Sequence, residues 1–510
     1  MPRVRTPNFH DARLSVAQSC IREQVAKRTP GAPASGLFAS NPQMQAAGAV
    51  LERVHRGEIR DAATADAAYR ARRAAQTAEG VSVAAPEGLA GDCTDLLVRY
   101  VIAWSLDDTD AMNLIRSEWT DSPCDATGWL QAVDDWLAYY WDGSEPQYAA
   151  PTATGPQPFA LPPAAAADGT LRVGVLGDWG TGEPEALAVL DQLMQTGPDV
   201  VIHVGDVYYA GTEDEQNSNF LVPIADARQK HRSDVPVYAL PGNHDYYSGG
   251  AGFYGMLARL NQGVANASVQ ANSFFCLRNA AWQLQGMDTG YNDSDLLHVA
   301  QDDTHLRSDE AAWHQAQLAG AGGRRVILFS HHQLFSAFEQ IGKLWQNPSL
   351  TANLTAWRAV TPAPGIAAWL WGHEHVLEVY QVPGTLPVVG RCIGNGAFPV
   401  FTDSAGYTPG TTSVPLQPAT TSPGGGIPFP NGFVQSQPDD LVWASGYTVL
   451  ELAADGTGTA SYYQVTFNGD VSAATSQLLW TESIPAVSAQ TLDTSGVSIA
   501  SPEPAARSDY

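Results

Sequence analysis

Short apolar runs separated by polar segments occur along the middle of the chain, and an amphipathic segment follows the first run. The runs have the length of buried β-strands, and polar turns containing glycine follow most of them. An amphipathic pattern over Glu185–Met194, with Pro184 near its first turn, predicts a helix after the first strand. The expected strands are Leu171–Leu176, Val200–Val204, Val235–Leu240, Arg325–Phe329 and Ala367–Trp371, with Gly446–Leu452 and Thr459–Val465 closing a sheet. This alternation of strand and helix predicts an α/β domain.

The chain before this domain has helical rather than strand-like spacing. Thr94–Trp119 and Trp129–Trp141 are rich in Leu, Ile, Val and Trp, so we expect them to form a packed helical pair. Further helices are expected over Asp11–Lys27, Pro42–His55 and the alanine- and arginine-rich Ala62–Ala78. The pattern therefore predicts a helical N-terminal region attached to an α/β domain.

Composition divides the chain into four parts. We expect the helical region over residues 1–147, a Pro/Ala-rich linker over 148–170, the catalytic domain over 171–482 and a flexible tail over 483–510. Within the catalytic domain, residues 403–440 are dense in Pro, Gly, Ser and Thr. This stretch is too long for an ordinary connection, so we expect a long loop that is mobile or binds a ligand.

The charge balance limits the partners of the protein. The formal net charge of the 510 residues is -26, and no basic stripe is present, so the sequence predicts no nucleic-acid partner. No apolar stretch approaches the roughly 20 residues that span a bilayer, so we expect no membrane partner. A small phosphate ester remains compatible with this negative charge, because bound metals would make the local potential positive.

Cysteine usage and the N-terminus bear on localisation. The five cysteines are Cys20, Cys93, Cys124, Cys276 and Cys392; they are far apart and form no Cys-x-x-Cys pair. Two arginines follow Met1, but no apolar segment of a secretory signal comes after them. We therefore expect a reducing, cytoplasmic location, with export left open.

Polar motifs follow the predicted strands. They contain carboxylates, an amide, imidazoles and phenols, which are hard or borderline metal ligands. Because strand ends gather the active site of an open α/β sheet, we expect these side chains to meet. The motifs are Gly177–Gly180 (GDWG), Gly205–Tyr209 (GDVYY), Gly242–Asp245 (GNHD), Ser330–His332 (SHH) and Gly372–His375 (GHEH). One metal rarely needs so many ligands, whereas two metals sharing a carboxylate would, and such pairs catalyse in-line displacement at phosphorus.

The order and spacing of these motifs resemble the calcineurin-like metallophosphoesterase superfamily. Gly180 stands where many members have a histidine after the first aspartate, and Tyr209 stands in a Gly-Asp-x-x-Tyr pattern. These two details together resemble the purple acid phosphatase branch, in which a phenolate replaces the lost ligand. The resemblance covers about Leu171–Val465 and implies a β-sandwich flanked by helices, in α/β/β/α layers. Plant-type members carry a β-sandwich before this domain, which the helical pattern here does not match.

The resemblance also implies a ligand for each metal position. The first metal would be iron(III), and the second a divalent ion such as zinc, manganese or iron(II). The implied ligands are Asp178, Tyr209 and His375 for the first metal, Asn243, His331 and His373 for the second, and Asp206 as the bridge. The residue types agree, since an anionic set suits a trivalent ion and an amide with two imidazoles suits a borderline divalent ion.

The resemblance further implies that His244 contacts the phosphoryl oxygens or protonates the leaving group, and that Asp245 orients His244. Two alternatives remain open at this point. Tyr208 is a second candidate for the polar phenol. His332 is a second candidate for the ligand in its motif, since adjacent residues of a strand point to opposite faces.

These inferences favour a dinuclear metal-dependent hydrolase of phosphomonoesters, with in-line attack by a metal-bound hydroxide. The alternative on the same metals is a phosphodiesterase or nucleotide pyrophosphatase, because pocket loops decide the leaving group. A third reading, a non-catalytic protein whose helical region binds a partner, predicts damaged motifs, and these motifs are intact. The helical region could also mediate a homo-oligomer.

Overall fold

The structure is a computed structural model of the whole chain. It describes residues 46, 49–50, 53–54, 56–78, 89–104, 106–120, 122, 145–151, 158–208, 210–293, 304–336, 341, 344–380, 388–398, 433–437, 440–443, 445–466 and 470–484.

Two β-sheets form the centre of the α/β domain. The six-stranded sheet has the order β15-β14-β13-β2-β3-β4. Its strands are β2 (Leu171–Leu176), β3 (Val200–His203), β4 (Val237–Ala239), β13 (Gly446–Leu452), β14 (Gly458–Thr466) and β15 (Thr475–Ile484). β2, β3 and β4 are parallel to one another, whereas β13, β14 and β15 extend the sheet in antiparallel pairs.

The seven-stranded sheet has the order β1-β5-β6-β7-β8-β10-β9. Its strands are β1 (Phe159–Ala160), β5 (Phe275–Arg278), β6 (Trp282–Met287), β7 (Arg325–Ser330), β8 (Gly365–Trp371), β9 (Leu377–Val379) and β10 (Val389–Ile393). The neighbours β6, β7, β8 and β10 run parallel. Both sheets therefore present several carboxyl ends of parallel strands, where ligand sites form.

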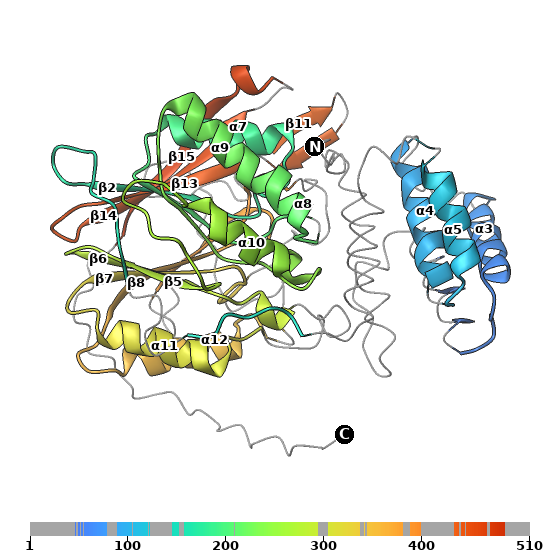
Figure 1. The fold of residues 1–510 in the computed structure, drawn as a ribbon, viewed down its shortest axis with the longest axis horizontal. Coiled ribbons are helices and arrows are strands. Elements are labelled where there is room, and N and C mark those ends of the chain that lie inside the picture. The colour runs from blue at the N-terminus through green and yellow to red at the C-terminus, as the bar shows by residue number, and fades with distance from the viewer. Residues whose placement is uncertain are drawn as a thin grey trace, which may run out of the picture.

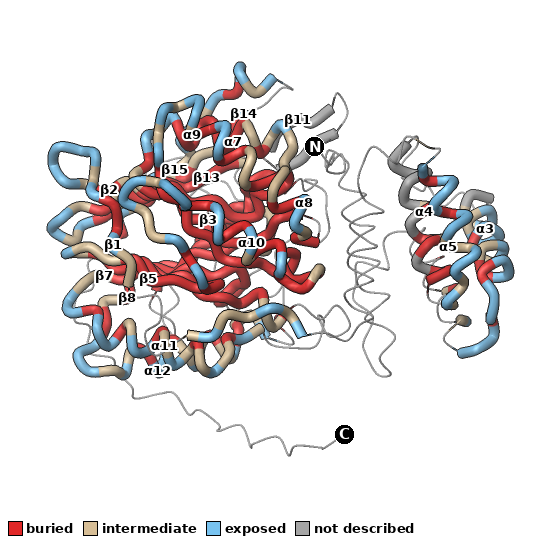
Figure 2. The backbone as a smooth tube through the Cα atoms, in the orientation of Figure 1, coloured by how far each residue is buried: buried red, intermediate tan, exposed pale blue. Residues whose placement is uncertain are grey.

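Helices cover the outer face of each sheet (Figure 1). The six-stranded sheet is covered by α7 (Pro184–Gln195), α9 (Val222–His231) and α10 (Ala251–Leu260), and the other sheet by α11 (Ser308–Ala319) and α12 (Pro348–Arg358). A core of buried residues from both sheets, including Val173, Ile202, Ile327 and Phe329, fills the space between them. Figure 2 shows the buried strands between more exposed helices. The expected α/β/β/α layers are confirmed.

The expected segment Thr94–Trp119 is two helices rather than one. α4 (Leu89–Trp104) and α5 (Thr109–Thr120) pack against each other, and α3 (Ala62–Ala78) packs against α4. The break has a local cause. Asp107 adopts a left-handed conformation with φ 55°, and the Asp108 carboxylate accepts a hydrogen bond from the Ala111 N–H at 3.0 Å, which caps α5. The expected helices Asp11–Lys27 and Trp129–Trp141 lie outside the described residues.

Parts of the expected linker, long loop and tail have regular structure. β1 lies within the linker and pairs in parallel with β5. Gln147 N–H donates to the Gly249 carbonyl. The chain therefore contacts the α/β domain at residue 147, just before the expected linker. β11 (Phe433–Gln437) and β12 (Asp440–Trp443) form a two-stranded ribbon at the end of the 403–440 segment. β15 extends to Ile484, just into the expected tail.

None of the helices described by the structure combines the length and the hydropathy of a membrane-crossing segment.

Candidate metal centre

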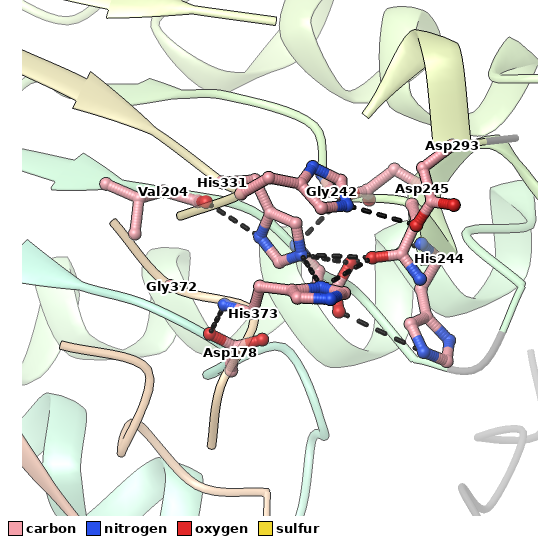
Figure 3. A network of polar contacts seen from close by, with 12 residues as sticks. Asp178, Val204, Gly242, His244, Asp245, Asp293, His331, Gly372 and His373 are labelled. Carbon is pink, nitrogen blue, oxygen red and sulfur yellow. Dashed lines mark hydrogen bonds and ion pairs between the residues drawn. The ribbon is translucent and has the colours of Figure 1, made fainter. Parts of the chain in front are cut away.

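The motif residues meet at the carboxyl ends of strands from both sheets. Asp178, Asp206 and Asn243 follow β2, β3 and β4 of the six-stranded sheet. His331 follows β7, and the Gly372–His375 motif follows β8 of the seven-stranded sheet. Figure 3 shows Asp178, His331 and His373 converging from these separate strand ends. The two sheets thus each contribute part of one polar cluster.

Asp178 is fully buried and lies in one group of expected ligands. Its Oδ1 is 3.4 Å from His375 Nε2 and accepts a hydrogen bond of 3.0 Å from the Tyr208 hydroxyl. Its Oδ2 accepts the backbone N–H of His373 at 2.8 Å. A side chain at residue 372 would meet this oxygen at 2.5 Å, which explains why glycine precedes His373.

Asp206 occupies the centre of the cluster, as a bridging carboxylate must. Its Oδ1 is 3.5 Å from His331 Nε2, and its Oδ2 is 4.0 Å from His244 Nε2. Donor atoms of Asp178, Asp206 and His331 lie within 4.8 Å of one another, and all three side chains are buried. These distances allow one cation to contact all three.

Asn243, His331 and His373 form the second group. The Asn243 Oδ1 is 3.1 Å from His331 Nε2 and 3.2 Å from His373 Nδ1. The two imidazole nitrogens are 3.3 Å apart. Three atoms from three different loops therefore point at one small volume.

The protonation pattern of this group favours a cation. His331 Nδ1 lies 3.0 Å from the Val204 carbonyl oxygen and must donate to it, which leaves a lone pair on Nε2. The Asn243 amide NH₂ donates to the Tyr247 hydroxyl, so its Oδ1 is the atom facing the imidazoles. A lone pair and a carbonyl oxygen thus face each other at 3.1 Å. Such a contact needs an N–H group or a cation beside it. His373 Nδ1 lies 3.2 and 3.3 Å from the two atoms, and without its proton it completes a donor set that fits a borderline divalent metal.

Several expected ligands have a strained backbone conformation. Asp178, Asp206 and His373 have φ angles of 53°, 73° and 70°, in the left-handed region that costs a non-glycine residue roughly 1–3 kcal/mol. The Asp245 carboxylate helps to hold one of these loops. It accepts hydrogen bonds from the backbone N–H groups of Asp206 and Gly242 at 3.0 and 2.8 Å. Strain of this kind concentrates at functional sites because it aims side chains that unstrained turns would not.

Burial and mutual repulsion move the pKa values of the two carboxyls apart. Burial and the negative charge of Asp178 raise the pKa of Asp206 well above its usual value. Burial alone would raise the pKa of Asp178 too, but its hydrogen bond with His375 and the charge of His331 lower it overall. Burial lowers the pKa of His331, which keeps its lone pair available. A cation between the two carboxyls would lower both pKa values, because it favours their ionised forms.

Comparison with known proteins identifies the domain. Residues 171–377 match the family model of the calcineurin-like phosphoesterases. The match covers less than half of the 510 residues, so the α/β domain of the chain is similar to this family over that region. A comparison with curated proteins finds no match. The family match supports a metal-dependent phosphoester hydrolase.

Solved structures show more distant likenesses to this chain. The purple acid phosphatase PPD1 from yellow lupin (Lupinus luteus) seeds is 14% identical, with a TM-score of 0.39 over 61% of this chain and 53% of the lupin chain. GAP50, the anchor in the inner membrane complex of Plasmodium, is 13% identical, with a TM-score of 0.39 over 61% of this chain and 89% of its own. The present chain thus spans about half the length of the lupin protein, and likenesses this distant do not indicate an activity.

Tyr208 lies beside the first group of expected ligands. It is fully buried, and its hydroxyl lies 3.0 Å from Asp178 Oδ1 and 3.2 Å from His375 Nε2. Burial and the charges of Asp178 and Asp206 raise the pKa of Tyr208 well above its usual value. Tyr209 lies outside the described residues, so its role as a ligand stays a prediction, with Tyr208 as the open alternative.

His244 and Asp245 make contacts that the sequence did not predict. The His244 ring packs between Tyr208 and Tyr247, with centroid distances of 4.7 Å to each. The Asp245 carboxylate accepts from Gln216 Nε2 at 2.6 Å in addition to the two backbone N–H groups. These contacts shape the loops of Asp206 and Asn243. The expected orientation of His244 by Asp245 stays a prediction.

Sequence reasoning missed three polar residues that support the site. Gln216 begins η3 (Gln216–Leu221), a π-helix of the kind found at functional sites. Thr289 and Asp293 follow β6 and contact His332. Asp288-Thr289-Gly290 follows a strand as the other motifs do, but threonine and aspartate are common in such turns, so this pattern does not identify Thr289 or Asp293.

Proposed function

We propose that the chain is a dinuclear metal-dependent phosphomonoesterase of the purple acid phosphatase-like branch. Asp178, a tyrosine and His375 would hold the first metal, and Asp206 would bridge. Asn243, His331 and His373 would hold the second metal. The motif set and the family assignment support this proposal.

One observation favours a metal site over a buried polar cluster that binds no metal. The His331 Nε2 lone pair and the Asn243 Oδ1 face each other at 3.1 Å, with His373 Nδ1 beside both. A folded core avoids such acceptor–acceptor contacts unless a cation or an N–H donor satisfies them. Three possible donor atoms that face one small volume therefore support a metal at this position.

The two ligand groups differ in character, which supports two different ions. A phenol, carboxylates and an imidazole suit a hard trivalent ion such as iron(III). An amide oxygen, two imidazoles and the shared carboxylate suit zinc, manganese or iron(II). When bound, such a pair would offset the charge of a phosphoryl group and lower the pKa of a coordinated water.

The protein supplies orientation and a proton. His244 Nε2 lies 4.0 Å from Asp206 Oδ2, at the side of the cluster, and His244 is more exposed than Asp178 or Asp206. From this position its Nε2–H can contact a phosphoryl oxygen or protonate the leaving oxygen. Asp245 and Gln216 hold the loops on either side, so that the ester binds against a preformed surface.

We propose a small phosphate monoester as the substrate. The net charge of -26 opposes a long polyanion, whereas one phosphoryl group would be neutralised by the two metals.

The test is metal analysis combined with phosphate release. Purified protein loaded with iron and zinc is expected to hold two metals per chain and to hydrolyse an aryl phosphate faster than the corresponding bis-aryl ester. Preference for the bis-ester would favour the phosphodiesterase instead. Fewer than two metals per chain, with no hydrolysis of either ester, would reject the dinuclear proposal.

A further inference from the structure

A fourth imidazole lies against the candidate metal ligands. His332 directly follows His331 and is only 1% exposed. Its ring centroid is 4.4 Å from that of His373 and 4.9 Å from that of His331. One nitrogen from each of these three rings lies within 4.8 Å of the others, so distance alone does not say which of them bind a metal.

The hydrogen bonds of His332 distinguish it from its neighbours. Its Nδ1 is 3.0 Å from the Thr289 hydroxyl, and its Nε2 is 3.0 Å from Asp293 Oδ2. Both ring nitrogens are therefore already engaged, whereas His331 uses only Nδ1 on the Val204 carbonyl and keeps Nε2 for the cluster. A metal could reach His332 only after one of these two bonds broke.

Thr289 and Asp293 come from one loop, which follows β6 and ends in the 3₁₀ turn η5 (Tyr291–Asp293). The Thr289 hydroxyl also accepts the backbone N–H of His332 at 2.9 Å, so the residue is held at its backbone and at both ring nitrogens. The loop is itself closed by a bond from Asp293 N–H to the Gly290 carbonyl at 3.0 Å. His332 therefore has a fixed orientation.

His373 is the residue that needs such support. Its φ of 70° is unfavourable for a histidine, and its ring is less buried than those of His331 and His332. The bond from its N–H to Asp178 fixes the backbone but not the ring. The His332 ring, tilted by 42° against it, limits how far the His373 imidazole can rotate.

We propose that His332 is a positioning residue of the metal centre. Held by Thr289 and Asp293, its ring keeps the His373 imidazole turned so that Nδ1 faces Asn243 and His331. The loop after β6 thereby sets the affinity of the second metal position without supplying a ligand. This inference rests on the proposed dinuclear function and concerns only the second position, because the first group of ligands lies around Asp178.

The experiment compares metal binding at the two positions in the full-length protein. The variants are His332→Ala, which removes the ring, His332→Phe, which keeps an aromatic face without the hydrogen bonds, and Asp293→Asn, which weakens the hold on Nε2. The control is His305→Ala, which removes an exposed imidazole from the same part of the fold. Each protein is loaded with iron and then titrated with Zn²⁺, and with Co²⁺ as a spectroscopic probe of ligand geometry.

We expect His332→Ala to weaken Zn²⁺ binding by about 10–100-fold, the usual effect of losing a residue that orients a ligand. Its bound Co²⁺ should show a changed visible spectrum, while its iron content stays that of the wild type. His332→Phe should recover part of the affinity because the ring contact returns, and Asp293→Asn should show a smaller loss. His305→Ala should match the wild type in every measurement.

Two results would overturn the inference. Wild-type zinc affinity and an unchanged Co²⁺ spectrum in His332→Ala and Asp293→Asn would show that the ring does not position His373. Loss of iron together with zinc in these variants would show a general effect on folding. Failure of the dinuclear function itself looks different, since wild-type protein would then bind fewer than two metals.

Discussion

Asp206 lies between the two groups of candidate ligands, and its role is tested by removing its charge. Asp206→Asn keeps the shape of the side chain but leaves two cations without the anion that must lie between them. We expect the variant to lose at least one metal per chain and its turnover to fall by roughly 10²-fold or more. Metal analysis beside phosphate release measures both effects. Two metals per chain with near-native turnover would exclude Asp206 as the bridge.

His244 is expected to act on the substrate rather than on a metal. His244→Ala removes a proton donor at the side of the cluster, so turnover on an aryl phosphate should fall by roughly 10²–10⁴-fold, the usual scale for acid–base catalysis. The metal content should equal that of the wild type. If the variant instead loses a metal, His244 is a ligand and its assigned role is wrong.

The tyrosine pair provides a matched comparison. A phenolate bound to iron(III), as the resemblance to purple acid phosphatases implies, gives a visible charge-transfer band. We expect Tyr209→Phe to bleach the iron-loaded protein, and Tyr208→Phe, which removes the hydroxyl that contacts Asp178 and His375, to keep the colour. The opposite result would make Tyr208 the ligand. A colourless wild type would place the chain outside the purple branch.

Motif side chains could be predicted from the sequence because their residue types are rare together and their strands are easily recognised. Asn243 and His331 illustrate this, since each comes within two residues of a glycine or serine at a strand end. Thr289, Asp293 and Gln216 could not, because threonine, aspartate and glutamine are common in loops. Their importance depends on which distant loop they approach after folding, and spacing along the chain does not contain that information.

At the scale of elements, the apolar runs predicted β2, β3, β4, β7, β8, β13 and β14, whereas other strands, β6 among them, were not predicted. β6 (WQLQGM) is buried throughout, yet Gln283 and Gln285 interrupt its apolar pattern. The Gln285 side-chain amide is 2.6 Å from His314 Nδ1 on α11, and the Gln283 amide donates to Gln285 Oε1. Those partners come from the tertiary fold, so a strand that satisfies its polar side chains in this way shows no clear periodicity.

The turn after β6 contains a buried carboxyl that should make stability depend on pH. Burial raises the pKa of Asp288 from 3.8 to about 6, against the hydrogen bond from the Tyr246 hydroxyl and the charge of His332, which lower it. Glu310 on α11 also faces it, and burial and the charge of Asp288 raise the pKa of Glu310. Because its pKa is higher in the folded state, protonated Asp288 favours folding relative to ionised Asp288. This contribution to stability is complete below pH 3.8 and is lost as the pH rises through about 6.

Asp288→Asn removes this titration. Relative to the wild type, the variant should gain stability as the pH rises from 4 to 8, by at most about 3 kcal/mol, since each unit of pKa shift corresponds to about 1.4 kcal/mol. Urea unfolding of both proteins at the two pH values measures the change. The comparison between pH values removes the constant cost of replacing an oxygen by an NH₂ group. Equal differences at pH 4 and pH 8 would show that the pKa of Asp288 is the same in the folded and unfolded states.

At the scale of the whole molecule, the expected metal ligands all lie between Asp178 and His375, well after the N-terminal helices. The boundary for removing those helices is set by contacts, because Gln147 N–H donates to Gly249 and Asn272 Nδ2 donates to the Ala149 carbonyl. We expect a protein lacking residues 1–144 to bind two metals and to hydrolyse a small aryl phosphate at a rate within a few-fold of the full chain. Loss of metal on truncation would make the helices part of the catalytic fold.

The division of the ligands between the sheets has a mechanical consequence. Asp178, Asp206 and Asn243 belong to one sheet, and the histidine ligands belong to the other. Bound metals would therefore cross-link the two sheets at one edge. Each metal at a concentration of 1,000 times its Kd would raise the free energy of unfolding by about 4 kcal/mol. Chelation should release both halves at once, so that amide hydrogen exchange rises together at the ends of β3 and β8 while α3, α4 and α5 exchange as before.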